Sequence, residues 1–135
     1  MVEEMIVSGP VILKHGKLLV IKEDKDDFYK LPGGRVEKDE TLEETCEREI
    51  KEEIDGEIII LKKLSPLILS ENPTTHKKMR IELNHFLAEL KNPLLIKPIE
   101  PIKEIKWLSL EQIKRKKYIV SPNINYLLGR GELEI

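Results

Sequence analysis

Residues 31–56 read LPGGRVEKDETLEETCEREIKEEIDG and contain the strongest helix pattern in the chain. Thr41 is a favourable N-cap residue, and Glu44 three residues later completes a capping box. Apolar residues then recur at every fourth position, which predicts one buried helix face: Leu42, Cys46, Ile50 and Ile54. Asp55 and Gly56 supply the stop signal. The sequence therefore predicts a helix that begins after Thr41 and ends at Asp55.

Three glutamates lie along the side of this helix that also carries the apolar face. On a helical wheel Glu53 falls inside the apolar arc, while Glu49 and Glu52 fall along its edge. A half-buried carboxylate is costly unless it is paired, protonated or bound to a metal, and Arg48 alone cannot neutralise three of them. Their oxygens can converge on a hard cation such as Mg²⁺ or Mn²⁺. The alternative is a solvated acidic face on a helix held by salt bridges.

A glycine-rich turn precedes the helix. Gly33 and Gly34 follow Pro32, and glycines let backbone N–H groups approach a phosphate closely. Taken alone, these residues are typical of an ordinary turn. Followed by an acidic helix with metal-type spacing, they indicate one half of a diphosphate-binding site.

The spacing of these residues resembles the Nudix box. Gly34 is followed by five residues, Glu40, seven residues and then the run Arg48-Glu49-Ile50-Lys51-Glu52-Glu53. The chain departs from the family pattern at its end, where Asp55 replaces the usual glycine and Gly56 replaces an aliphatic residue. The departure affects the helix cap, because the usual glycine serves as a C-cap, and it leaves the acidic residues unchanged.

The rest of the sequence predicts a mixed α/β or α+β layered fold, because strand patterns come before, between and after the helices. The expected strands cover Met5–Lys14, Lys17–Glu23, Ile58–Leu64, Leu67–Ser70, Met79–Leu90 and Ile102–Leu108. Two further helices are expected from Ser109 to about Lys116 and from Pro122 to Gly129. The family resemblance implies one Nudix domain over residues 1–135, folded as an α/β/α sandwich with a mixed β-sheet.

The resemblance also implies roles for individual residues. Glu49, Glu52, Glu53 and Gly34 would bind Mg²⁺, with Mn²⁺ as a substitute, and Arg48 would orient the glutamates. The turn residues Gly33, Gly34 and Arg35 would contact the substrate. Glu40 would either take part in the site or only stabilise the loop before the helix.

Residues outside the box complete the implied site. Glu104 is the first candidate for the general base and Glu100 the second, although a surface glutamate is at least as common at either position. Asn123 resembles the base-reading asparagine of MutT-type members, and its alternative is a simple polar residue early in a helix. His85, on the apolar side of its strand, is expected to be a satisfied core histidine, and Cys46 is expected to pack in the core.

The resemblance implies hydrolysis of a nucleoside diphosphate linked to another group. A MutT-type nucleoside triphosphatase is favoured by the small size of the chain and by Asn123. An ADP-ribose or sugar-nucleotide pyrophosphatase is the close second, because Pro73 falls a little beyond the place of the proline typical of that subgroup. A diadenosine-polyphosphate hydrolase is less favoured, because no tyrosine stands in the corresponding stretch. Two further classes are a non-catalytic nucleotide-binding module and a structural protein with an acidic face.

Composition excludes several classes. The 135 residues carry a formal charge of −2 with both signs interspersed, which is unlike a basic nucleic-acid-binding arm. The single cysteine excludes an internal disulfide, and no apolar stretch approaches the roughly 20 residues that cross a bilayer. We therefore expect a cytoplasmic protein with a small-molecule nucleotide substrate, no nucleic-acid or membrane partner, and either a monomeric or a homodimeric state.

Overall fold

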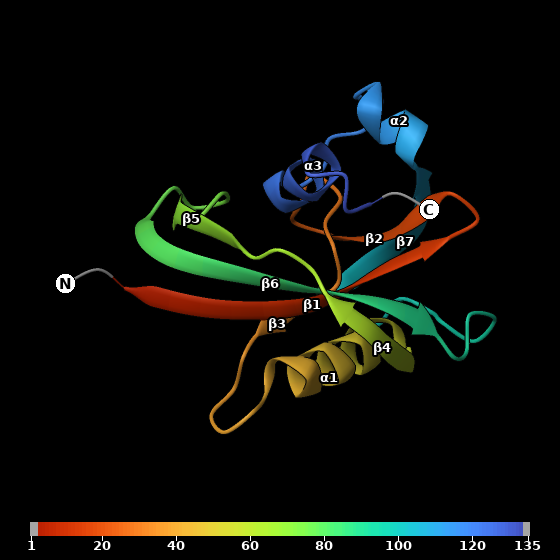
Figure 1. Cartoon of the computed structure of the whole chain (residues 1–135), viewed down its shortest axis with the longest axis horizontal. Coiled ribbons are helices and arrows are strands. Elements are labelled where there is room, and N and C mark those ends of the chain that lie inside the picture. The colour runs from red at the N-terminus through yellow and green to blue at the C-terminus, as the bar shows by residue number, and fades with distance from the viewer. Residues whose placement is uncertain (1–2, 134–135) are drawn as a thin grey trace.

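The computed structural model describes residues 3–133, in which strands and helices alternate along the chain (Figure 1). The elements are β1 (Glu4–Lys14), β2 (Lys17–Glu23), β3 (Gly34–Arg35), α1 (Leu42–Ile54), β4 (Ile58–Lys63), β5 (Leu67–Glu71), β6 (Lys78–Leu90), β7 (Ile102–Ser109), α2 (Leu110–Lys114) and α3 (Pro122–Gly129). Each strand and helix expected from the sequence is present, with ends that differ by at most two residues.

The strands form one mixed sheet. Five of them lie in the order β4-β6-β1-β2-β7, while β3 pairs with β1 and β5 pairs with β6. The two central strands, β1 and β6, run parallel from Glu4 opposite Arg80 to Ile12 opposite Ala88. The other pairs are antiparallel. The prediction of a mixed sheet is confirmed.

A tight hairpin joins β1 to β2. His15 and Gly16 both have positive φ, at 52° and 74°, which matches the twist of the two strands that they connect. Residues Leu18–Ile21 of β2 are fully buried on both faces, as in a strand that is covered by other elements on each side.

Two separate cores lie on the two faces of the sheet. The helix α1 covers one face, and α2 and α3 lie over the other (Figure 1). The apolar residues of α1 pack against Leu19, Ile21 and Phe86, whereas Ile124 and Leu127 of α3 pack with residues of the opposite face. Full burial of one such aliphatic side chain contributes roughly 1.5–3 kcal/mol. The layered α/β/α arrangement is thus the one expected from the sequence.

The caps of α1 follow from its sequence. The Thr41 side chain accepts the Glu44 N–H at 3.0 Å, and the Glu44 carboxylate accepts the Thr41 N–H at 2.9 Å. At the other end Asp55 takes the left-handed conformation with φ 56° and donates its N–H to the last turn. A side chain at Gly56 would place its Cβ 2.9 Å from Ile50, so the glycine there allows close packing. The departure from the box therefore leaves the helix end intact.

Residues 28–31 pair with the rest of the fold through single bridges, Ile21 with Lys30 and Tyr29 with Val120. One detail differs from what the sequence predicts. The helix α3 ends at Gly129 as expected, but the glycine with positive φ is Gly131, at 74°. Within residues 3–133, no helix has both the length and the apolar character needed to cross a bilayer.

Candidate active site

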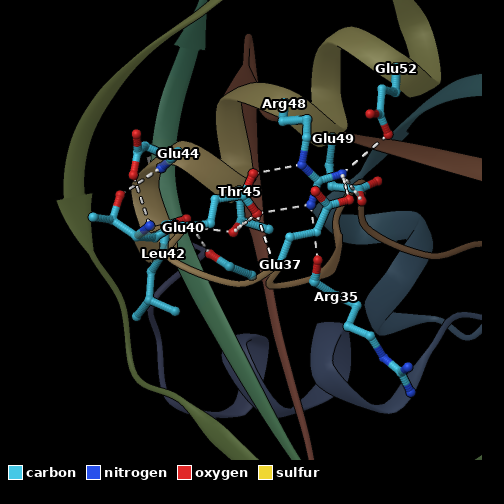
Figure 2. A network of polar contacts seen from close by, with 11 residues as sticks. Arg35, Glu37, Glu40, Leu42, Glu44, Thr45, Arg48, Glu49 and Glu52 are labelled. Carbon is cyan, nitrogen blue, oxygen red and sulfur yellow. Dashed lines mark hydrogen bonds and ion pairs between the residues drawn. The ribbon is translucent and has the colours of Figure 1, made fainter.

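Arg48, at the middle of α1, holds the loop before the helix to the acidic side of the helix (Figure 2). Its Nε and Nη2 donate to the two oxygens of Glu40 at 2.7 and 3.0 Å, and Nη2 also donates to the Arg35 carbonyl at 2.9 Å. Its Nη1 donates to Glu49 at 2.8 Å and to Glu52 at 3.2 Å. One guanidinium therefore fixes two of the three candidate metal ligands relative to the turn.

Glu40 acts as an anchor of the loop. Besides the two bonds from Arg48, it accepts the Thr45 hydroxyl at 2.7 Å and the Glu37 N–H at 3.1 Å. The hydrogen bonds from Arg48 and Thr45 lower the pKa of Glu40 to about 2. Both oxygens of Glu40 already accept hydrogen bonds from protein groups. This favours a role for Glu40 in stabilising the loop before α1 over direct participation in the site.

Glu49 packs directly against Gly34. The glycine belongs to β3 and pairs with Ser8 of β1, so the backbone of the turn is held against the sheet. A Cβ atom at position 34 would lie 2.5 Å from the Glu49 carboxyl carbon, a distance that no real side chain tolerates. The Glu49 side chain is 15% exposed, and burial raises its pKa. Glycine here leaves room for the Glu49 carboxylate beside the turn, and a larger residue would displace that carboxylate.

Glu53 contacts the other glycine of the turn. Its Oε1 accepts the Gly33 N–H at 2.9 Å. Burial, and secondarily the like charge of Glu49, raise the pKa of Glu53 to about 8, although the Gly33 hydrogen bond acts in the opposite direction. Gly33 itself has φ 144°, and a Cβ there would lie 2.8 Å from the Gly9 Cα. The turn and the end of α1 are thus joined through a carboxylate that water solvates poorly.

The three glutamates do not converge on one point in this structure. Across residues 3–133 no three His, Cys, Asp or Glu side chains are arranged to hold a metal ion. Glu52 is 57% exposed and turns toward Arg48, while Glu53 turns toward Gly33. The donor set nevertheless fits a hard cation, because Glu49 and Glu53 are poorly solvated carboxylates beside the same turn and both have raised pKa values. A divalent cation would remove their mutual repulsion.

A pocket of about 250 Å³ lies on the other side of the turn. Its wall includes Phe28, Pro32, Gly33, Pro73, His85 and Asn123. Gly33 therefore belongs both to this pocket and to the turn that contacts Glu53. Arg35 does not line this pocket. Its carbonyl accepts a hydrogen bond from Arg48, and its side chain extends away from the glutamates (Figure 2).

Asn123 and His85 contact each other at the wall of the pocket. The Asn123 Nδ2 lies 3.0 Å from the His85 Nε2, and the Ser121 hydroxyl donates to the Asn123 Oδ1 at 2.6 Å. His85 is only 2% exposed, and its Nδ1 lies 3.4 Å from the Ser65 carbonyl. The expectation of a buried, satisfied histidine is confirmed. Its contact with Asn123 was not expected, because nothing in the sequence relates two residues 38 positions apart.

Glu104 lies apart from the glutamates of α1. Its neighbours on β7, Ile105 and Trp107, pack in the core beneath α1, so the alternation of the strand directs Glu104 to the opposite face of the sheet. There it accepts the Tyr29 hydroxyl at 3.0 Å. In this structure Glu104 is a hydrogen-bond partner of Tyr29, and its role as a general base stays a prediction.

Glu100 precedes β7 in the chain, and its neighbour Ile99 donates its N–H to the Glu53 carbonyl at 2.9 Å. The loop that carries Glu100 therefore runs past the end of α1. Of the two general-base candidates, Glu100 is the one whose adjoining backbone contacts the helix.

A charged cluster beside the pocket is not predicted by the sequence. Lys30 pairs with Glu23 and, at 3.2 Å, with Asp26, and both Lys30 and Asp26 line the pocket. Lys, Glu and Asp side chains are ordinarily solvated at a protein surface, and no sequence pattern indicates that these three meet. The cluster places a partly buried ammonium group near the Glu53 end of α1, where its charge lowers the Glu53 pKa.

Cys46 is fully buried, and burial raises the pKa of its thiol to about 12. The Ser8 hydroxyl lies 3.2 Å from its sulfur. Because this thiol on the buried face of α1 stays protonated, Cys46 acts as a core packing residue, as the sequence predicts.

Comparison with known proteins identifies the family of this chain. A family model described as the NUDIX domain matches residues 4–127. The structure of a MutT NUDIX hydrolase from Burkholderia pseudomallei aligns with a TM-score of 0.69 and 22% identity, over 81% of this chain and 85% of that chain. The MutT protein from Methanosarcina mazei Go1 aligns with a TM-score of 0.72 and 21% identity, over 87% and 86%. A Nudix-family hydrolase from Clostridium perfringens aligns with a TM-score of 0.74 and 19% identity, over 96% and 95%.

No curated protein matches the chain in sequence. These structural neighbours are all below 25% identity, so they show the fold, and the family model carries the assignment. Because that model spans residues 4–127, including the turn, α1 and most of α3, the chain belongs to the Nudix family of hydrolases that act on pyrophosphate bonds.

Proposed function

We propose that this protein is a Mg²⁺-dependent pyrophosphohydrolase whose substrate is a nucleoside triphosphate. One observation carries the proposal: Gly33 separates a 250 Å³ pocket from the carboxylates of α1. A substrate whose base occupies the pocket would extend its phosphates over the turn toward Glu49 and Glu53. A nucleotide fits both parts of this site, since it carries a flat base for the pocket at one end and a diphosphate for the carboxylates at the other.

Each part of the site has a function in this proposal. A divalent cation held by Glu49, Glu52 and Glu53 would neutralise the diphosphate and acidify the attacking water. Arg48 holds Glu49 and Glu52 in place, and Gly33 and Gly34 keep the backbone close enough for phosphate oxygens to reach it. Water would attack one phosphorus of the diphosphate, the bridging P–O bond would break, and two phosphorylated products would leave.

The nucleoside triphosphate is favoured by Asn123, which lines the pocket with an amide that can both donate to and accept from a base. Two of the structural neighbours are named MutT. Pro73 also lines the pocket, which supports an ADP-ribose or sugar-nucleotide pyrophosphatase as the second candidate. A non-catalytic nucleotide-binding module is disfavoured, because the chain retains Arg48 and the three candidate metal ligands Glu49, Glu52 and Glu53, which binding alone would not require.

A substrate panel tests the proposal. The purified protein is incubated with Mg²⁺ and each of the eight common nucleoside triphosphates, ADP-ribose, a UDP-sugar and diadenosine polyphosphates, and the products are identified by mass. A nucleoside monophosphate with pyrophosphate is the result expected from a triphosphate. Efficient hydrolysis of ADP-ribose alone would replace the first candidate by the second, and binding without turnover would favour the non-catalytic module.

Activity is expected to require a divalent cation. Without one, the acidic side of α1 faces the negative phosphates, and the cationic Arg48 is already engaged by Glu40, Glu49 and Glu52. The measurement is turnover of the best substrate in excess EDTA, followed by titration with Mg²⁺ or Mn²⁺. Turnover in EDTA at the rate seen with Mg²⁺ would contradict the proposed mechanism.

The Asn123→Ala variant is expected to lose about tenfold in kcat/KM for the preferred base, since one hydrogen bond is lost and its partner is left unpaired. Discrimination between purines and pyrimidines should shrink in the same variant. Both are measured by competition between two triphosphates in one reaction. If the base preference is unchanged, the base is recognised elsewhere in the pocket, and Phe28 is the next residue to vary.

A further inference from the structure

We propose that His85 sets the orientation of the Asn123 side-chain amide and is thereby a positioning residue that lets the pocket distinguish 6-oxopurines from 6-aminopurines. The proposal rests on the function proposed above and goes beyond it, because it assigns a role in base specificity to His85, a pocket-wall residue that is only 2% exposed and that acts through its neighbour Asn123. It is carried by a chain of hydrogen bonds that runs from Ser65 through His85 and Asn123 to Ser121.

The chain of hydrogen bonds has only one consistent direction. The Ser65 carbonyl can only accept, so the His85 Nδ1 that faces it at 3.4 Å carries the proton. In the neutral ring the Nε2 is then an acceptor, and the group 3.0 Å away must be the NH₂ of Asn123 rather than its oxygen. The Asn123 Oδ1 accepts the Ser121 hydroxyl at 2.6 Å.

The two ends of this chain are themselves held. The N–H and the hydroxyl of Ser65 both donate to one Glu132 oxygen, at 3.0 and 3.1 Å, which anchors the residue whose carbonyl His85 faces. His85 is 2% exposed, and its burial lowers the pKa of the ring, although the Glu132 charge acts in the opposite direction. The ring therefore stays neutral with one tautomer, and Nε2 remains an acceptor.

A fixed amide gives the pocket a fixed polarity. Asn123 lines the pocket, and its amide keeps one N–H and one oxygen lone pair that none of these hydrogen bonds uses. Rotation of the amide by 180° would place Oδ1 against the His85 Nε2, so two acceptors would meet and a hydrogen bond would be lost. The 6-position is an acceptor in guanine and a donor in adenine, and the neighbouring N1 is a donor in guanine and an acceptor in adenine. For a base that enters the pocket in one orientation, the held amide therefore pairs with only one of the two purines.

The test compares two substitutions at position 85. His85→Gln keeps an oxygen for the Asn123 NH₂ and an amide N–H for the Ser65 carbonyl, whereas His85→Leu removes both and keeps an apolar side chain of similar size. The measured quantity is the ratio of kcat/KM for dGTP and dATP, with the purine that the wild type prefers as the numerator. We expect His85→Leu to reduce this ratio about tenfold, mainly through KM, and His85→Gln to keep it within about threefold.

A double-mutant cycle identifies the route of the effect. If His85 acts through Asn123, the combined His85→Leu, Asn123→Ala variant should have the same dGTP/dATP ratio as Asn123→Ala alone. Full additivity of the two changes would overturn the proposal. So would a wild-type ratio in His85→Leu combined with a reduced ratio in Asn123→Ala.

Two further measurements keep the proposal testable if His85→Leu does not fold. Ser121→Ala removes the other hydrogen bond to the amide, and the Ser121 side chain makes no capping bond to α3, so the helix should persist. This variant should also reduce the ratio. In the wild type, ¹⁵N NMR of the His85 ring should show the Nδ1–H tautomer, and the Nε2–H tautomer would overturn the proposal whatever the substrate is. Failure to hydrolyse any triphosphate, with the Nδ1–H tautomer present, would instead overturn the proposed function.

Discussion

The Glu53→Gln variant is expected to lose about 100-fold or more in kcat/KM and yet to unfold at a higher temperature than the wild type when no metal is present. Gln retains the oxygen that accepts the Gly33 N–H and keeps the shape of the side chain. It removes a charge that burial and Glu49 both disfavour. Loss of the metal ligand therefore lowers activity, whereas removal of the buried charge raises the melting temperature of the metal-free protein.

The pH dependence of this stabilisation has a definite sign. In the metal-free folded protein the pKa of Glu53 is about 8, whereas an unfolded glutamate titrates near its ordinary value of 4.5. The folded state binds the proton more tightly, so Glu53 costs nothing below about pH 4.5 and destabilises increasingly up to about pH 8. The melting temperatures of variant and wild type should be similar at about pH 4.5 and differ by roughly 10 °C at about pH 8.5.

Saturating Mg²⁺ should narrow or reverse the difference, because the wild type gains binding free energy and the variant gains less. Glu47→Gln is the matched control, since Glu47 is an exposed residue of the same helix. The control should show neither the pH dependence nor the metal dependence. A melting difference for Glu53→Gln that is the same at both pH values, with and without Mg²⁺, would show that these carboxylates form no shared metal site.

The Gly34→Ala variant is expected to have about 10- to 100-fold lower kcat/KM and a weaker affinity for Mg²⁺. The added Cβ would lie 2.5 Å from the Glu49 carboxyl carbon, so the carboxylate must leave its position beside the turn. Glu49 would then keep its bond to Arg48 only by moving the guanidinium, which also holds Glu40 and the Arg35 carbonyl.

Gly129→Ala is the control for this substitution. An added Cβ at position 129 would meet no atom within 4 Å, and the residue belongs to α3, where alanine is favoured over glycine by roughly 0.5–1 kcal/mol. This variant should keep full activity and melt at the same or a higher temperature. Isothermal titration with Mg²⁺ and steady-state kinetics give the comparison. Wild-type metal affinity in Gly34→Ala would show that Glu49 is not placed by its contact with the glycine.

Features that depend on neighbouring residues could be predicted from the sequence. Thr41 and Glu44 form the capping box of α1 because both groups lie within one turn. His15 and Gly16 form the β1–β2 turn because their own backbone conformations suit it. The periodicity of apolar residues likewise placed Cys46, Ile50 and Ile54 in the core, since a helix has a fixed repeat.

The chemistry of the site depended on tertiary structure. The sequence indicated that Glu53 lies on the apolar side of α1, but its pKa is raised by burial that exists only in the folded protein. Glu104 could not be assigned to a face, because its direction depends on how β7 pairs with β2. The cluster of Lys30 with Glu23 and Asp26 also needed the fold, since it forms where the loop after β2 closes against the pocket.

The sequence by itself determined the elements and the spacing of the acidic residues on α1, because helix and turn formation are local and their periodicities are fixed by backbone geometry. Only the tertiary structure decided which side chains meet across the chain. The contact of His85 with Asn123 joins β6 to α3, and it exists because both elements pack on the same face of the sheet. Packing of distant segments, which no local pattern records, therefore determines both the solvation of Glu53 and the polarity of the pocket.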